Sequence, residues 1–234
     1  MTRDVPSLDA IEAILFDLDG TLVETSNRWG EMIARQLLFL KRPFPRVNTE
    51  KLGRQMVAAI EMPGNYVVSF IERIGLSGSI QGIADRMRRS KGLATRANSS
   101  LIPGSLRLLE ELAGRYRMAV VTTRARPEAV AFVRNMGMER YFPVVISRGD
   151  VWRMKPHPAP VRRAAQLLGV PPERCIMVGD TTMDIRAGRG AGAYAVGVLS
   201  GYGLREELES AGAHLVLERA EQLLEYLPND AGDG

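Results

Sequence analysis

Residues 13–22 read Ala-Ile-Leu-Phe-Asp-Leu-Asp-Gly-Thr-Leu, four apolar residues followed by two aspartates that flank one leucine. A short apolar run that ends in polar residues and glycine is typical of a strand buried on both faces and of the loop that leaves it. Four later segments have the same form, an apolar run with polar residues or glycine directly after it: Met118–Val121, Pro143–Ile146, Cys175–Val178 and Ala193–Val198.

Helix-like segments lie between these predicted strands. They are Ser105–Gly114, Pro127–Gly137, Pro158–Gly169 and Met183–Gly190, and three of the four carry proline or serine near the start and glycine just past the end. Strands that alternate with helices indicate an α/β fold, a Rossmann-like parallel sheet with helices on both faces. We assign this core to residues 1–24 and 101–234.

Residues 25–100 interrupt that alternation. Their apolar residues follow a helical period in four segments separated by proline and glycine: Trp29–Leu40, Thr49–Ile60, Tyr66–Ile74 and Ile80–Arg88. The pattern predicts a small all-helical domain inserted after the first strand. It carries 13 Lys and Arg against 5 Asp and Glu, a balance of +8, whereas the rest of the chain has a balance of −4.

The positive balance of the insert has two interpretations. It is either solvated surface or an attraction for an anionic substrate or partner. Nucleic acid is not expected, because the basic residues are scattered and no aromatic-rich binding motif accompanies them.

Composition narrows the class of protein further. The 234 residues contain no apolar run of the roughly 18–20 residues that span a bilayer, and the N-terminus lacks the apolar stretch of a signal peptide, so we expect a cytoplasmic protein. One cysteine and two histidines exclude a disulfide framework and a typical zinc site. Carboxylate oxygens would have to hold any metal, which indicates Mg²⁺.

The polar residues that follow the predicted strands should meet at one edge of the sheet, because parallel strands end at the same edge, where ligands bind. The predicted site residues are Asp17, Asp19, Gly20, Thr122, Thr123, Lys155, Asp180 and Asp184. Each alone is compatible with a turn or a helix cap, and their recurrence at this one edge favours a site.

The chemistry of these side chains suits a metal ion and a phosphoryl group. Carboxylates that crowd together repel one another unless a cation lies between them, and we predict metal ligands at Asp17, Asp19 and Asp180 with Asp184 in a supporting position. Thr122, the backbone around Gly20 and Thr123, and the ammonium of Lys155 are donors for phosphate oxygens. Lys155 is the one lysine outside residues 25–100.

Four segments together resemble the motifs of the haloacid dehalogenase-like hydrolase superfamily. They are Asp17-Leu-Asp-Gly-Thr-Leu22, Val120-Val-Thr122, Lys155-Pro-His-Pro158 and Val178-Gly-Asp-Thr-Thr-Met-Asp184. The insert between the first two motifs is similar in position to the helical cap of the phosphoglycolate phosphatase-like subfamily. The chain departs from the usual pattern at Thr123, where relatives commonly carry Asn, and at Thr181, where Ser is usual.

The resemblance implies a magnesium-dependent phosphatase, a phosphoric monoester hydrolase. With the basic insert, it leads us to expect a small phosphorylated metabolite with negative charge beyond its phosphate as the substrate. Asp17 would attack phosphorus and form an aspartyl-phosphate, while Asp19 would protonate the leaving oxygen and then deprotonate the hydrolytic water. Thr122 and Lys155 would hold the phosphoryl group.

Other functions share parts of this pattern. A phosphomutase uses the same two aspartates, a phosphonatase would need a cap lysine such as Lys41 or Lys51, and a dehalogenase does not need Asp19. A receiver-like phospho-aspartate signalling switch also places an aspartate cluster, Thr or Ser, and Lys at strand ends, but it lacks the second aspartate and the large insert. The glycines Gly188 and Gly190 fit a dinucleotide-binding pattern only loosely, because they do not directly follow a strand.

Overall fold

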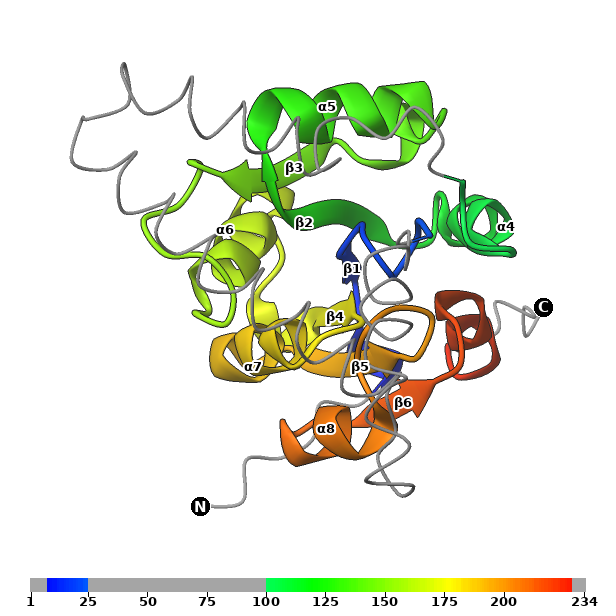
Figure 1. Cartoon of the computed structure of the whole chain (residues 1–234), viewed down its shortest axis with the longest axis vertical. Helices are drawn as coiled ribbons and strands as arrows, with labels where there is room; N and C mark the ends of the chain where they lie inside the picture. Colours follow the sequence, from blue (N-terminus) through cyan, green and yellow to red (C-terminus); the bar gives the residue numbers. More distant parts are fainter. Residues whose placement is uncertain (1–7, 25–99, 229–234) are drawn as a thin grey trace, which may run out of the picture. The chain divides into compact units, whose positions relative to one another are not determined.

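Six parallel strands form one sheet in the order β3-β2-β1-β4-β5-β6 (Figure 1). Their bounds are β1 Ala13–Phe16, β2 Arg117–Ala125, β3 Val144–Arg148, β4 Cys175–Gly179, β5 Tyr194–Val198 and β6 Leu215–Leu217. The computed structural model describes residues 8–24 and 100–228. The predicted helical insert falls outside these residues, so its domain boundaries and helical character stay predictions.

The helices alternate with the strands along the chain. They are α4 Ser105–Leu112, α5 Arg126–Asn135, α6 Ala159–Leu168, α7 Thr182–Ala191 and α8 Arg205–Ser210, with 3₁₀ helices that include η5 at Ala220–Glu225. The predicted α/β class with a parallel sheet is therefore confirmed. Among the described residues, no helix has the length and apolarity needed to cross a membrane.

The central strand β1 explains why helices cover both faces. Successive side chains of a strand point to opposite faces. Ile14 and Phe16 pack in the cluster that contains apolar residues of α4, α5 and η5, whereas Ala13 and Leu15 pack with apolar residues of α6 and α7. All four β1 residues are fully buried, which is why the strand reads as an unbroken apolar run.

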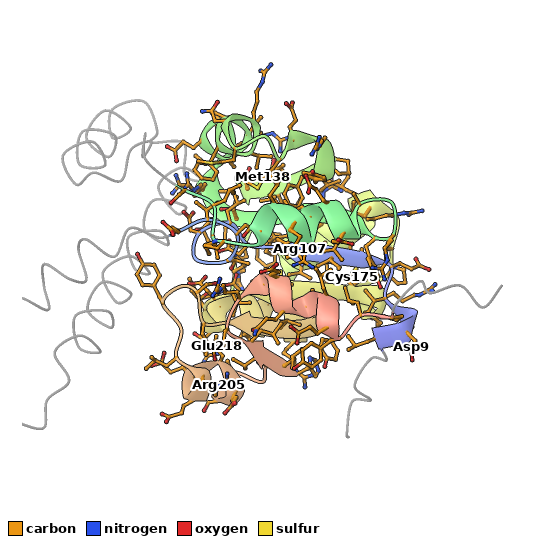
Figure 2. All side chains as sticks on the ribbon, turned by 90° about the vertical axis from the view of Figure 1, so that its right-hand side faces the viewer. Asp9, Arg107, Met138, Cys175, Arg205 and Glu218 are labelled. Atoms are coloured by element: carbon orange, nitrogen blue, oxygen red, sulfur yellow. The ribbon has the colours of Figure 1, made fainter. Side chains whose placement is uncertain are left out.

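The two layers of helices are visible in the figures. In Figure 1, α6 and α7 lie to the left of the sheet and α4 lies to its right. Figure 2 looks onto the second of these faces, where Arg107 of α4 lies near η5 and contacts Glu221, with Arg107 Nη1 3.3 Å from Glu221 Oε1.

The strand order creates a reversal beside β1. The chain passes from β1 to β2 and then β3 on one side, and β4 returns to pair with the other side of β1. Open α/β sheets bind ligands at the carboxyl ends of strands where the order reverses. The residues directly after β1 and β4 are Asp17 and Asp180.

A short pairing joins the two chain segments that flank the insert. Val23 and Leu101 form an antiparallel bridge. The Ile102 amide donates to the Leu22 carbonyl at 3.0 Å, and the Glu24 amide donates to the Ser100 carbonyl at 2.9 Å. The chain therefore leaves and re-enters the sheet domain at neighbouring points.

Candidate active site

Asp17 is held at the end of the central strand by backbone pairing. Its amide donates to the Val178 carbonyl of β4 at 2.9 Å, which continues the β1–β4 ladder by one residue. The side chain is 10% exposed, and its Oδ1 atom lies 2.8 Å from Lys155 Nζ.

Lys155 uses all three of its ammonium hydrogens. It donates to Asp17 Oδ1 at 2.8 Å, to the Val121 carbonyl at 2.9 Å and to Asp184 Oδ1 at 2.6 Å. Burial by itself lowers the pKa of Lys155, but attraction to Asp17 and Asp184 outweighs burial and raises this pKa above its ordinary value. The ammonium therefore stays charged and links the residue after β1 and the middle of β2 to the first turn of α7.

Asp184 belongs to the first turn of α7 and both of its oxygens are engaged. Oδ1 accepts from Lys155, and Oδ2 accepts from the Thr181 amide at 3.1 Å and from Thr181 Oγ1 at 2.5 Å. A Cβ atom at Gly179 would lie 2.2 Å from Asp184 Cβ, so glycine is needed where β4 ends. Asp184 is thus fixed by its own helix start as well as by Lys155.

Asp180 has two oxygens in different environments. Oδ2 accepts a hydrogen bond from the Tyr202 amide at 2.8 Å. Oδ1 is buried without a hydrogen-bond partner in the described part of the chain. A buried carboxylate oxygen without a partner is costly, which makes this atom a candidate metal ligand.

Three carboxylates converge at this point. Asp17, Asp180 and Asp184 each offer an oxygen within 4.8 Å of the others, and all three residues are buried. Burial, together with the charges of Asp184 and Asp19, raises the pKa of Asp17 to about 7, against the lowering effect of Lys155. Burial, with the charges of Asp184 and Asp17, also raises the pKa of Asp180 well above its ordinary value.

These residues fit a divalent cation. Three ionised carboxylates and one ammonium leave two negative charges uncompensated, which a divalent ion balances. The donors are all oxygens, the ligands Mg²⁺ prefers, and Asp180 Oδ1 is an available one.

The Asp19 carboxylate lies outside this group of three. Both of its oxygens accept from Arg124, with Nε at 2.7 Å from Oδ2 and Nη2 at 2.6 Å from Oδ1. The Asp19 side chain is therefore held by Arg124 and does not join the three converging carboxylates.

Of the predicted phosphate-binding residues, Lys155 and Gly20 lie against these carboxylates, whereas Thr122 and Thr123 belong to β2. Thr122 is fully buried in β2, and its Oγ1 atom accepts from the Arg124 amide at 3.2 Å. Thr123 is the next residue of the same strand and is partly buried. Gly20, at φ +80°, lies against Asp180, because a Cβ atom there would be 2.4 Å from Asp180 Oδ2.

One local prediction is wrong. Thr122 and Thr123 were expected in a loop after the second strand, but β2 continues to Ala125, with a register shift against β3 between Val121 and Ala125. Irregularities of this kind bend a strand and redirect its side chains, and they are frequent beside active sites.

Two parts of the site were not predicted from the sequence. Arg124 directly follows Thr122 and Thr123, but nothing in the sequence distinguishes it from the other arginines, of which the chain has 27 in all. The Gly201-Tyr-Gly203 segment after β5 contacts Asp180, and its dense glycines at a strand end were the available signal.

Comparison with known proteins decides the family. A family model described as haloacid dehalogenase-like hydrolase matches residues 14–198. The chain belongs to this family. The match includes all four motifs, so the resemblance inferred from the sequence is confirmed, and the protein is a hydrolytic enzyme of the haloacid dehalogenase-like type.

Individual relatives of this haloacid dehalogenase-like hydrolase cover nearly the whole chain. A phosphoglycolate phosphatase of Pectobacterium atrosepticum is 29% identical over 225 residues, which are 93% of this chain and 92% of the relative. The pyrophosphatase PpaX of Halalkalibacterium halodurans is 30% identical over 199 residues, 84% of this chain and 86% of the relative. A haloacid dehalogenase-like hydrolase from Streptococcus pneumoniae has a similar structure, with a TM-score of 0.66, 25% identity and coverage of 93% of this chain and 98% of the other.

Proposed function

We propose that this protein is a magnesium-dependent phosphatase that hydrolyses a small phosphomonoester through an aspartyl-phosphate on Asp17. The observation that carries the proposal is the contact between Asp17 and the fully engaged ammonium of Lys155, at the edge where two further carboxylates converge. The names of the relatives support phosphate-ester or phosphoanhydride hydrolysis rather than another reaction of the family.

In the first step, a carboxylate oxygen of Asp17 attacks phosphorus and the bond from phosphorus to the ester oxygen breaks. Asp19 gives its proton to the departing oxygen, which leaves as an alcohol. Thr122 would hold a phosphoryl oxygen. Lys155, whose three hydrogens are engaged in the described protein, would attract the phosphoryl group by its positive charge, so the reacting atoms are aligned before the bond changes.

In the second step, the ionised Asp19 takes a proton from water, whose oxygen attacks the phosphorus of the aspartyl-phosphate. The bond to Asp17 breaks, which releases inorganic phosphate and restores the carboxylate. Bound Mg²⁺ would supply positive charge that compensates the carboxylates and the phosphoryl oxygens.

The proposed metal ligands are Asp17, Asp180 and the backbone carbonyl of Asp19. Asp184 has a supporting role, because its oxygens are already engaged by Lys155 and Thr181. Since burial raises the pKa of Asp17 to about 7 in the metal-free protein, the cation would also keep this nucleophile ionised at neutral pH.

We propose that the substrate carries a second anionic group. Phosphoglycolate has a carboxylate and pyrophosphate a second phosphate, and these are the compounds after which the relatives are named. The excess of basic residues in 25–100 supports the same substrate class. Within this class we propose a cytoplasmic metabolite.

The experiment is phosphate release in Mg²⁺ from 2-phosphoglycolate, pyrophosphate, a hexose phosphate and an aryl phosphate, with Asp17→Asn as the control for contaminating activity. We expect release from at least one compound and none from the variant. Release should fall more steeply with added salt for the doubly anionic substrates than for the aryl ester. Failure of every compound contradicts a phosphatase. A product phosphorylated at a second position without free phosphate indicates a mutase.

A further inference from the structure

The loop after β5, residues 199–204, bonds to two separate parts of the site, and we refer to it as the β5 loop. The Tyr202 amide donates to Asp180 Oδ2 at 2.8 Å, and the Gly203 amide donates to the Asp180 backbone carbonyl at 3.0 Å. Ser200 Oγ donates to the Gly20 carbonyl at 2.7 Å. The loop therefore connects the residue after β4 with the segment that follows the nucleophile.

Three glycines make this close approach possible. A Cβ atom at Gly201 would lie 1.9 Å from Asp180 Oδ2, and one at Gly20 would lie 2.4 Å from the same atom. A Cβ atom at Gly203 would lie 2.2 Å from the Asp180 backbone oxygen. Gly201 does not have a left-handed backbone, so it is required for space and not for conformation.

The consequence is that the two oxygens of Asp180 are unequal. The β5 loop occupies Oδ2 with a hydrogen bond and surrounds it with backbone, whereas Oδ1 remains buried and unpartnered in the described residues. Asp180 is 1% exposed, so rotation of its carboxylate to present both oxygens would require the loop to move.

We propose that the β5 loop fixes Asp180 as a one-oxygen metal ligand and thereby makes the site select Mg²⁺ over Ca²⁺. Mg²⁺ requires near-ideal octahedral geometry and is held through few carboxylates, whereas Ca²⁺ takes six to eight ligands and accepts both oxygens of a carboxylate. A site that withholds the second oxygen of Asp180 penalises the larger ion. Gly201, Tyr202 and Ser200 act as positioning residues through Asp180 and Gly20.

The test is calorimetric titration of metal-free protein with Mg²⁺ and with Ca²⁺, in the absence of substrate. Gly201→Ala should displace the Asp180 carboxylate and weaken Mg²⁺ binding about 10–100-fold, the usual effect of disturbing residues that orient a ligand. The affinity for Ca²⁺ should change less, so the preference of the site for Mg²⁺ over Ca²⁺, measured as the ratio of the two dissociation constants, should decrease. Gly190→Ala is the matched control, since its Cβ atom would meet Pro158 at an ordinary 3.5 Å.

A second variant guards against misfolding. Ser200→Ala removes the bond to Gly20 without adding atoms, and thermal unfolding in chelator measures the integrity of each variant. If Gly201→Ala unfolds, the ratio of the Mg²⁺ and Ca²⁺ dissociation constants is measured for Ser200→Ala instead, and this ratio tests the proposal. An unchanged ratio in the folded variants, or equal weakening for both ions, overturns the proposal.

The inference rests on the proposed function only for the presence of the metal site. Wild-type protein that binds Mg²⁺ selectively but releases no phosphate contradicts the phosphatase and leaves the role of the β5 loop intact. Wild-type protein that hydrolyses phosphoesters, with variants that keep the metal preference, contradicts only the role of the loop.

Discussion

Arg124 presents a two-pronged hydrogen bond to Asp19, with Nε and Nη2 at 2.7 and 2.6 Å from the two carboxylate oxygens. The guanidinium also lies 4.2 Å from the centre of the Phe132 ring in α5. Although burial lowers the pKa of Arg124, the bond and charge of Asp19 raise it above its ordinary value. The carboxylate of Asp19, the proposed acid and base, is therefore held by Arg124 of β2, whose guanidinium in turn lies against Phe132 of α5.

Arg124→Met keeps an aliphatic side chain beside Phe132 and removes the two hydrogen bonds. We expect kcat for an alkyl phosphate to fall about 10–100-fold, because Asp19 is no longer aligned with the leaving oxygen. The leaving oxygen of an aryl phosphate needs less protonation, so kcat for an aryl phosphate should fall less. Arg124→Lys keeps the positive charge but cannot make both hydrogen bonds in the same plane, so its kcat should lie between those of the wild type and of Arg124→Met. Steady-state rates on both esters measure this, and equal losses would argue against an effect through Asp19.

Asp19→Asn should separate the two chemical steps. Asp17 can still accept the phosphoryl group from an aryl phosphate, but water is no longer deprotonated. Full turnover should slow about 10²–10⁴-fold, the usual contribution of general acid and base catalysis. Rapid mixing should reveal a burst of aryl alcohol followed by a slow steady state. A uniform loss without a burst would contradict the assignment of Asp19.

Asp180→Asn and Asp184→Asn should differ in metal binding. Asp180 has the available oxygen, so its replacement should weaken Mg²⁺ binding at least about 100-fold, whereas Asp184→Asn should weaken it about tenfold through its contact with Lys155.

In chelator, Asp180→Asn should be at least as stable as wild type, because a buried carboxylate with a raised pKa is replaced by a neutral group. Calorimetry and thermal unfolding measure both. Activity in fully demetallated enzyme would refute the metal site.

His214 should make the protein labile to acid. Its Nδ1 accepts from the Ala195 amide at 2.8 Å, and its ring stacks on Tyr194 with centroids 4.5 Å apart. Burial and the neighbouring Arg189 lower the pKa of His214 from 6.5 to about 4.

The unfolded chain therefore binds a proton at this residue below about pH 6.5, and the folded chain does so only near pH 4. The contribution of neutral His214 to the free energy of unfolding is therefore fully present above pH 6.5 and is lost as pH falls from 6.5 toward 4. Denaturant titrations of wild type and His214→Gln at pH 8 and pH 5 test this. The variant should lose less stability between the two pH values, and an equal loss would place the acid lability elsewhere.

The central strands were predictable from the sequence because burial on both faces leaves a continuous run of apolar residues. β1 spans the residues expected of it, and β4 differs from its prediction by one residue. Cys175 is fully buried in β4, as expected of a small apolar side chain. The edge strand β6 and the six-residue helix α8 were missed, because segments this short show too little periodicity to stand out.

The site was predictable where a polar residue directly follows an apolar run. Asp17 and Asp180 are of this kind. Arg124 and the β5 loop act through hydrogen bonds between residues more than 20 positions apart, and such contacts depend on strand order, which the pattern of apolar residues does not specify. Lys155 was predicted from its rarity, but its bond to the Val121 carbonyl was not.

The pairing of Glu24 with Ser100 has a consequence for how this enzyme can change over generations. Since the ends of the insert already touch, the sheet domain closes on itself whatever sequence connects them. Each doubling of a connecting loop costs only about 0.6 kcal/mol in closure entropy, so long and short connections are nearly interchangeable in stability. A different connecting segment can therefore be exchanged at this single junction while the residues of the proposed site stay unchanged, and under our proposal for residues 25–100 such an exchange would alter which anionic substrate is preferred.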